Sequence, residues 1–158
     1  MDGSLSEHLA RLDLERRRLK EIVARLSVQE VATVSVVEGW TVKDVLAHVA
    51  IWDRWELEQM RCMLYGRVPE HLTDDGVDSR NEAAVEEWRD RPVAEVLREI
   101  DDARDEWLRW LVTLTEQEFA KPRTFHGEDW SFSACVRVQW EHDREHAEQI
   151  VQADSNAR

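Results

Sequence analysis

The stretch LSEHLARLDLERRRLKEIVARL, residues 5–26, carries the clearest fold signal in the chain. Leucine recurs every seven residues in it, at positions 5, 12, 19 and 26, and Leu9, Val23 and Arg16 fall on the same seam. Such spacing places apolar side chains along one stripe of an α-helix, which must pack against other helices. We therefore expect a long helix from about Ser6 to Leu26 that forms one side of a bundle.

Three more long helices are expected further along the chain. The second starts after the Thr41 cap and runs to Tyr65, before Gly66; the third starts at Pro92 and runs to about Leu114; the fourth covers about Ser133 to Gln152. One short extra helix, Ser79 to Arg89, precedes the third. The sequence thus predicts an all-α protein, a four-helix bundle with long connections, forming a single domain over residues 1–158.

The connections carry weaker signals. Ser27-x-x-Glu30 and Thr115-x-x-Glu118 are capping boxes that open short helical turns. Val31 to Val37 is rich in β-branched residues, but a lone strand would have no partner, so no strand is expected there. The polar segment from Arg67 to Asp78 is the longest irregular stretch and a candidate flap.

The two halves of the chain resemble each other. A shift of 88 residues superposes Arg16 on Arg104, and the first capping box on the second. After a small change of spacing, Trp40-Thr41 matches Trp130-Ser131. Each half therefore reads as a long helix, a capped turn, a Trp-Thr/Ser entry and a second long helix.

Composition restricts the partners and the compartment. The chain has 158 residues, 42% hydrophobic and 35% charged, with a formal net charge of −13. Nucleic acid and anionic membranes would be repelled by that charge, so we expect neither as a partner. Cys62 and Cys135 are far apart and form no CxxC unit, and the first residues hold no apolar signal. These features favour a cytoplasmic protein with reduced thiols.

Three histidines fall on inner helix faces. His142 and His146 are four residues apart, so their side chains lie on one face of the fourth helix, and His48 is the lone histidine of the second. Two imidazoles at this spacing can coordinate one metal ion together with a third ligand from another part of the chain. We expect one divalent ion, Zn²⁺ or Ni²⁺ first, with Fe²⁺ and Mn²⁺ as alternatives.

Other residues are weaker candidates around this site. The string His142 to His146 also spells HxxEH, in which Glu145 would be a catalytic base; an exposed helical acid is the alternative. Asp44 could assist a metal-bound water, but its position three residues after Thr41 is that of a helix cap. Cys135 could line a pocket or be a buried inert thiol.

The stretch Glu38 to His48, EGWTVKDVLAH, resembles the W-[ST]-x-x-[DE]-[VL]-L-x-H segment of the DinB-like (YfiT-like) metalloproteins. Glu141 to Ile150, EHDREHAEQI, resembles their closing H-x-x-x-H-x-x-Q-I segment. The resemblance covers nearly the whole chain. It implies a four-helix bundle with a triple-histidine site for a divalent cation, at His48, His142 and His146.

The same resemblance suggests functions. The family includes mycothiol- and bacillithiol-dependent transferases and isomerases, members described as metal-dependent hydrolases, and frequent homodimers. In a thiol-transfer reaction on a small-molecule substrate, Arg16 and Arg104 could contact a carboxylate-bearing thiol cofactor; alternatively both extend to the bundle ends. A non-catalytic binding bundle with a structural metal is the competing hypothesis, because no general base or anion clamp is evident.

Overall fold

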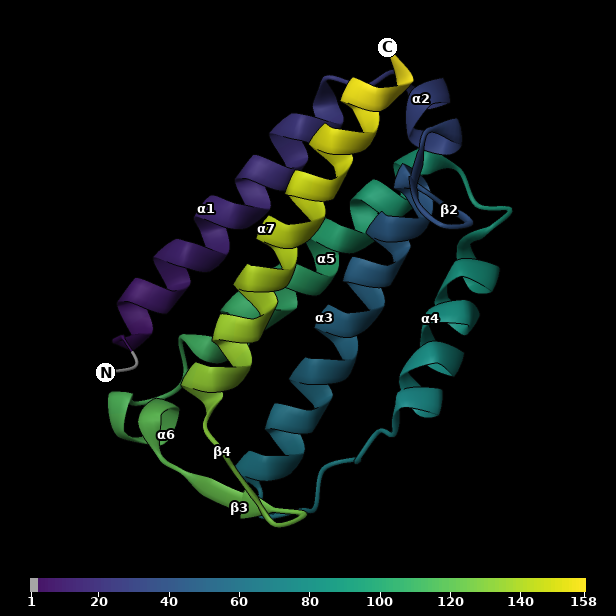
Figure 1. Ribbon diagram of the computed structural model, residues 1–158. Coiled ribbons are helices and arrows are strands. Elements are labelled where there is room, and N and C mark those ends of the chain that lie inside the picture. Colours follow the sequence, from purple (N-terminus) through teal and green to yellow (C-terminus); the bar gives the residue numbers. More distant parts are fainter. Residues whose placement is uncertain (1–2) are drawn as a thin grey trace.

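The computed structural model describes residues 3–158 and builds them from helices joined by short turns and two small hairpins (Figure 1). In chain order the elements are α1 (Leu5–Ala24), α2 (Val28–Thr33), β1 (Ser35–Val37), β2 (Trp40–Thr41), α3 (Val42–Leu64), α4 (Asp74–Trp88), α5 (Val93–Leu111), α6 (Glu116–Ala120), β3 (Arg123–Phe125), β4 (Glu128–Trp130) and α7 (Phe132–Ala157).

The four long helices α1, α3, α5 and α7 form the bundle. Helix α1 lies along α7 and α3 lies along α5, while α4 packs on the outer side of α3 (Figure 1). The expected all-α fold, with one short extra helix before the third long one, is confirmed. The element order also repeats: a long helix, a short capped helix, a hairpin and a second long helix occur twice.

Helix ends follow the capping signals in the sequence. Ser4, Ser27, Thr41 and Thr115 each accept a backbone N–H bond in a capping box. One boundary was wrong: the short helix α4 starts at Asp74 rather than at 79, because Thr73 caps it by accepting from the Gly76 N–H. The irregular segment is accordingly shorter than expected.

The two connections contain strands, contrary to expectation. Ser35–Val37 pairs antiparallel with Trp40–Thr41, so the β-branched stretch finds its partner three residues further on. Arg123–Phe125 pairs with Glu128–Trp130 in the same way. Gly39 and Gly127 have positive φ angles of 78° at the two turns, a conformation that glycine adopts without strain. Each hairpin delivers the chain into the next long helix.

A layer of buried charges crosses the middle of the bundle. Each long helix contributes one residue: Arg16 from α1, Asp53 from α3, Arg104 from α5 and Asp143 from α7. Arg16 Nη2 lies 2.8 Å from Asp53 Oδ2 and 3.0 Å from Asp143 Oδ1. Arg104 lies 3.0 Å from a carboxylate oxygen of each aspartate. We call these four residues the Arg–Asp layer.

The Arg–Asp layer separates two apolar clusters. Leu19, Val45 and Ile150 belong to the cluster on one side, and Leu12 and Trp107 to the cluster on the other. The alternative in which Arg16 and Arg104 extend to the bundle ends is wrong, because both side chains are buried and paired inside. Within residues 3–158, no helix is long and apolar enough to span a bilayer.

Candidate metal centre

His48, His142 and His146 meet between α3 and α7. His142 Nε2 lies 2.8 Å from His48 Nε2 and 2.9 Å from His146 Nε2. The three ring nitrogens all lie within 4.8 Å of one another, the only such group of potential metal ligands in the described part of the chain. The spacing of the two α7 histidines and the inward position of His48 therefore produce the cluster, which we call the histidine triad.

The tautomer of His48 follows from its neighbours. Trp52 Nε1 donates to Asn81 Oδ1 at 2.7 Å, and an indole N–H can only donate, so the amide oxygen of Asn81 faces both rings. His48 Nδ1 lies 2.9 Å from the same oxygen and must donate to it. His48 Nε2 is therefore unprotonated and presents its lone pair to the triad.

His146 is held in a similar way, and His142 is not. His146 Nδ1 lies 2.8 Å from Gln149 Oε1, so its proton is directed away from the triad. His142 Nδ1 is buried and has no hydrogen-bond partner among the described residues. His142 Nε2 has one proton at most to share between two lone pairs, so the polar atoms of the triad are not mutually satisfied.

Burial keeps the three imidazoles neutral. It lowers the pKa of His48 to about 4, with a further contribution from His146, although the bond to Asn81 acts in the opposite direction. Burial, followed by repulsion from His146 and His48, places the pKa of His142 well below its ordinary value. Burial also lowers the pKa of His146. Neutral imidazole is the form that binds a metal.

The geometry fits one divalent ion. Tetrahedral coordination with metal–nitrogen bonds of about 2.0–2.1 Å separates ligand nitrogens by roughly 3.3 Å. The observed separations of 2.8 and 2.9 Å are a few tenths of an ångström shorter, a difference that small ring rotations can remove. Three protein ligands leave at least one coordination position for water or a substrate, as in catalytic rather than structural sites.

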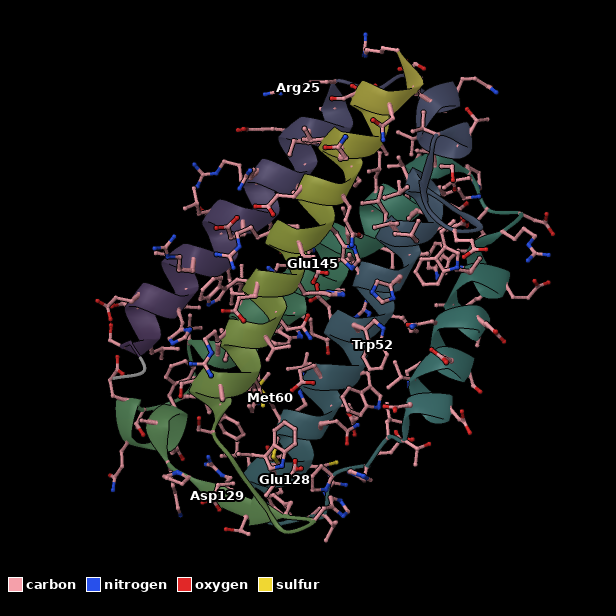
Figure 2. The ribbon with its side chains drawn as sticks, viewed as in Figure 1. Arg25, Trp52, Met60, Glu128, Asp129 and Glu145 are labelled. Atoms are coloured by element: carbon pink, nitrogen blue, oxygen red, sulfur yellow. The ribbon has the colours of Figure 1, made fainter. Side chains whose placement is uncertain are left out.

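The other sequence candidates lie apart from the triad nitrogens. Glu145 is exposed on α7, and its role as a base stays a prediction (Figure 2). Asp44 accepts from the Thr41 backbone N–H at 2.9 Å, which confirms its role as a helix cap. Cys135 is buried, and burial followed by the nearby Glu56 carboxylate raises the pKa of its thiol, as expected of an inert cysteine.

Arg16 and Arg104 hold charges that Asp53 and Asp143 already neutralise. Burial alone favours neutral Asp143, but Arg104 and Arg16 outweigh it and lower the pKa of that carboxyl. Both arginines line a hollow of about 430 Å³ between α1 and α5, whereas the triad lies between α3 and α7. Their predicted contact with a cofactor stays a prediction, and it would compete with strong ion pairs.

The structure adds residues that the sequence reasoning missed. Gln149 lies three residues after His146, so helix geometry could have identified it, whereas Asn81 on α4 carries no sequence signal.

The expectation that His8 is a surface residue was wrong: it is buried, and its Nδ1 accepts from Trp140 Nε1 at 3.3 Å. His71 and His126 lie in connections as expected, but their rings lie close together, with centroids 5.1 Å apart at a tilt of 41°, and both line a pocket.

None of the triad histidines lines that pocket, which has a volume of about 340 Å³, but a neighbour of His48 does. Its walls include Trp52, whose ring centroid is 6.3 Å from that of His48, together with Trp55 and Trp130. We call it the tryptophan pocket. A wider hollow of about 570 Å³ opens between the outer faces of α1 and α7, and none of the triad histidines lines it.

The family model of the DinB superfamily matches residues 11–150 of the chain. No curated protein sequence matches the chain.

Several solved structures share the fold. YfiT from Bacillus subtilis, described as a probable metal-dependent hydrolase with an unusual four-helix bundle topology, is 17% identical, with a TM-score of 0.77 over 97% of this chain and 87% of that one. The colibactin self-resistance protein ClbS, solved with a dsDNA, is 9% identical, with a TM-score of 0.83 over 96% of each chain.

A mycothiol-dependent maleylpyruvate isomerase is 15% identical, with a TM-score of 0.77 over 94% of this chain and 61% of that one. At these identities the likeness establishes the shared fold alone.

Proposed function

Because the chain belongs to the DinB superfamily, we propose that it binds one divalent metal ion on His48, His142 and His146 and acts as an enzyme on a small molecule. The observation that carries this proposal is the convergence of three neutral imidazoles, two buried and one partly buried, whose nitrogens do not satisfy one another. A site kept only for stability would need no open coordination position. Zn²⁺ and Ni²⁺ are the first candidates, with Fe²⁺ and Mn²⁺ as alternatives.

The reaction we favour is transfer or isomerisation that depends on a low-molecular-weight thiol. A bound divalent ion lowers the pKa of a coordinated thiol and so supplies a nucleophile at neutral pH. The mycothiol-dependent isomerase with this fold supports that choice. In this chain, Asn81 and Gln149 fix two imidazoles so that their lone pairs face the site.

A metal-dependent hydrolase is the second candidate, because YfiT is described as one. The same triad would then activate water instead of a thiol. The sequence suggests Glu145 and Asp44 as candidate helpers of that water. Asp44 is engaged as a helix cap and Glu145 is exposed on α7, so we favour the thiol reaction over the hydrolase.

The remaining proposals concern partners and context. ClbS was solved with dsDNA, yet the net charge of −13 on this chain opposes binding to a polyanion, so we propose no nucleic-acid partner. We further propose a single domain, a cytoplasmic location without membrane contact, and a homodimer as the form to look for.

Metal analysis of tag-free protein tests the site. We expect about one divalent ion per chain in the wild type and almost none in His142→Ala, while His8→Ala, outside the triad, keeps its ion. Full metal retention in His142→Ala would refute the assignment.

A thiol screen tests the reaction. Metal-loaded protein is assayed with mycothiol, bacillithiol and glutathione against a panel of electrophiles, with His142→Ala as the control. Turnover with one thiol identifies a transferase or isomerase. Hydrolysis of activated esters or amides without any thiol would favour the second candidate instead.

A further inference from the structure

The tryptophan pocket runs along the lower half of α3. Trp52 lies at the end near the triad and Glu128, on the second hairpin, at the opposite end (Figure 2). Trp52 also shares Asn81 with His48, because both donate to the same amide oxygen. A molecule in the pocket would therefore lie against the wall that borders the proposed metal.

The walls are aromatic. Trp52, Trp55 and Trp130 line the pocket, and the rings of Trp52 and Trp55 meet edge to face with centroids 5.3 Å apart. The rings of His71 and His126 complete one side. Several indole faces around one cavity bind flat apolar groups, and they also attract cations that are removed from water.

The charges at the pocket are negative. Glu56, Glu70 and Glu128 line it, and none of the described lining residues is lysine or arginine. Arg80 pairs with Glu70 at 3.0 Å and neutralises that carboxylate, and its guanidinium lies over the Trp55 ring, 5.7 Å from the ring centroid. Within residues 3–158, no cation lies within ion-pair distance of Glu56 or Glu128. Two acidic residues therefore line the cavity without an ion-pair partner, Glu56 buried and Glu128 exposed to solvent.

Glu56 is the more informative of the two. Its side chain is only 9% exposed, and it accepts a weak hydrogen bond from the Cys135 thiol. Burial raises the pKa of this carboxyl, and the thiol bond offsets that effect only in part. Burying a carboxylate with no cation beside it costs free energy, unless a bound ligand supplies the positive charge. The Arg–Asp layer, one turn away on α3, shows how this fold pairs its other buried acids.

We propose that the tryptophan pocket binds the organic part of the substrate as a cation, an aromatic or apolar amine or quaternary ammonium, with Glu56 as its buried counter-charge. The inference rests on the proposed function for the role of the ligand as substrate, although binding itself needs no metal. Anionic substrates would meet two uncompensated carboxylates and are excluded by this arrangement.

Calorimetric titration with matched probes tests the proposal on the full chain. The probes are benzyltrimethylammonium, which cannot coordinate a metal, the uncharged benzyl alcohol, and phenylacetate. We expect the cation to bind at least tenfold more tightly than the alcohol, and phenylacetate not to bind. Shifts in the indole N–H resonances of Trp52, Trp55 and Trp130 should locate the ligand. Equal binding of all three probes, or shifts confined to other tryptophans, would overturn the proposal.

Variants separate charge from shape. Glu56→Gln keeps the side-chain volume and should weaken cation binding about tenfold while leaving benzyl alcohol unchanged. Glu58→Gln, an exposed change on the same helix, removes the same formal charge and should leave both affinities unchanged. If Glu56→Gln does not fold, Trp55→Leu serves instead and should weaken the cation more than the alcohol. Unchanged cation binding in the folded variant contradicts the proposal.

The metal-free variant His142→Ala separates this inference from the proposed function. It should bind benzyltrimethylammonium within about threefold of the wild type. If the wild type holds no metal but binds the cation normally, the proposed metal-dependent activity is refuted and the proposed cation binding in the tryptophan pocket is supported. If the wild type holds its metal but binds no cation, the proposed cation binding is refuted and the proposed metal site is supported.

Discussion

The histidine triad and the Arg–Asp layer are neighbours that gather polar groups of different kinds. His142 and Asp143 are consecutive residues on α7, yet Asp143 forms ion pairs with two arginines, while His142 Nε2 meets only other imidazoles. Among the described residues, each group also holds one buried nitrogen without a hydrogen-bond partner, Arg104 Nε in the layer and His142 Nδ1 in the triad. The layer balances two positive charges with two negative ones. The triad instead gathers neutral acceptors, which a cation from outside can satisfy. The contrast identifies the layer as structural and the triad as the candidate site.

The largest effect should come from breaking the Arg–Asp layer. Asp53→Ala leaves Arg16 and Arg104 buried with one carboxylate between them, so the free energy of unfolding should fall by about 3–5 kcal/mol. Urea unfolding in the presence of chelator measures this. The exposed Asp102→Ala serves as the control and should change stability by less than about 0.5 kcal/mol. A loss below about 1 kcal/mol in Asp53→Ala would mean that the layer does not hold the bundle together.

A smaller effect, confined to the triad, is expected from Asn81→Ala. The change removes the acceptor that orients His48, so the dissociation constant for Zn²⁺ should rise about 10–100-fold, while the metal-free protein stays folded. Competition with a chromophoric chelator measures the affinity. Asn81→Asp restores an acceptor at the same place and should recover the affinity. Equal affinity in wild type and Asn81→Ala would show that this hydrogen bond does not orient the ring.

The smallest effect concerns Glu56, a buried acid that lacks the arginines of the layer. Because burial raises its pKa above the ordinary value of 4.5, the unfolded state releases the proton more readily than the folded state once the pH exceeds 4.5. Stability is therefore lost as the pH rises, and Glu56→Gln should avoid that loss. In metal-free protein the variant should melt about 2–4 °C above wild type at pH 8, with a smaller gap at pH 5. If the difference in melting temperature between variant and wild type instead becomes smaller from pH 5 to pH 8, burial does not raise the pKa of Glu56.

The long helices and most residues of the triad and the layer could be predicted from the sequence, because the spacing of apolar residues determines which helix faces are buried. The leucine repeat and the capping boxes gave the four long helices, and the i, i+4 spacing brought His142 and His146 together. The partners of Arg16 and Arg104 could also have been found, since Asp53 and Asp143 are related by the 90-residue shift that aligns the two tryptophan entries.

Other features depend on packing between elements that are distant in sequence. Asn81 reaches His48 only because α4 folds back on α3. The hairpin strands are two or three residues long, too short for an alternating pattern. The tryptophan pocket combines α3 with two connections, so no local pattern could have shown that Glu56, His71 and His126 share a cavity. The start of α4 was a missed local signal, since Thr73 followed by two aspartates is a helix N-terminus.

X-ray absorption spectroscopy of zinc-loaded, tag-free protein reports directly whether the ion binds to the histidine triad. We expect a coordination shell containing three imidazole nitrogens at about 2.0–2.1 Å, completed by a light atom from solvent, and almost no bound zinc in His142→Ala. A shell containing sulfur from Cys62 or Cys135, or only oxygen ligands, would show that the ion binds elsewhere and that the histidine triad is not the metal site.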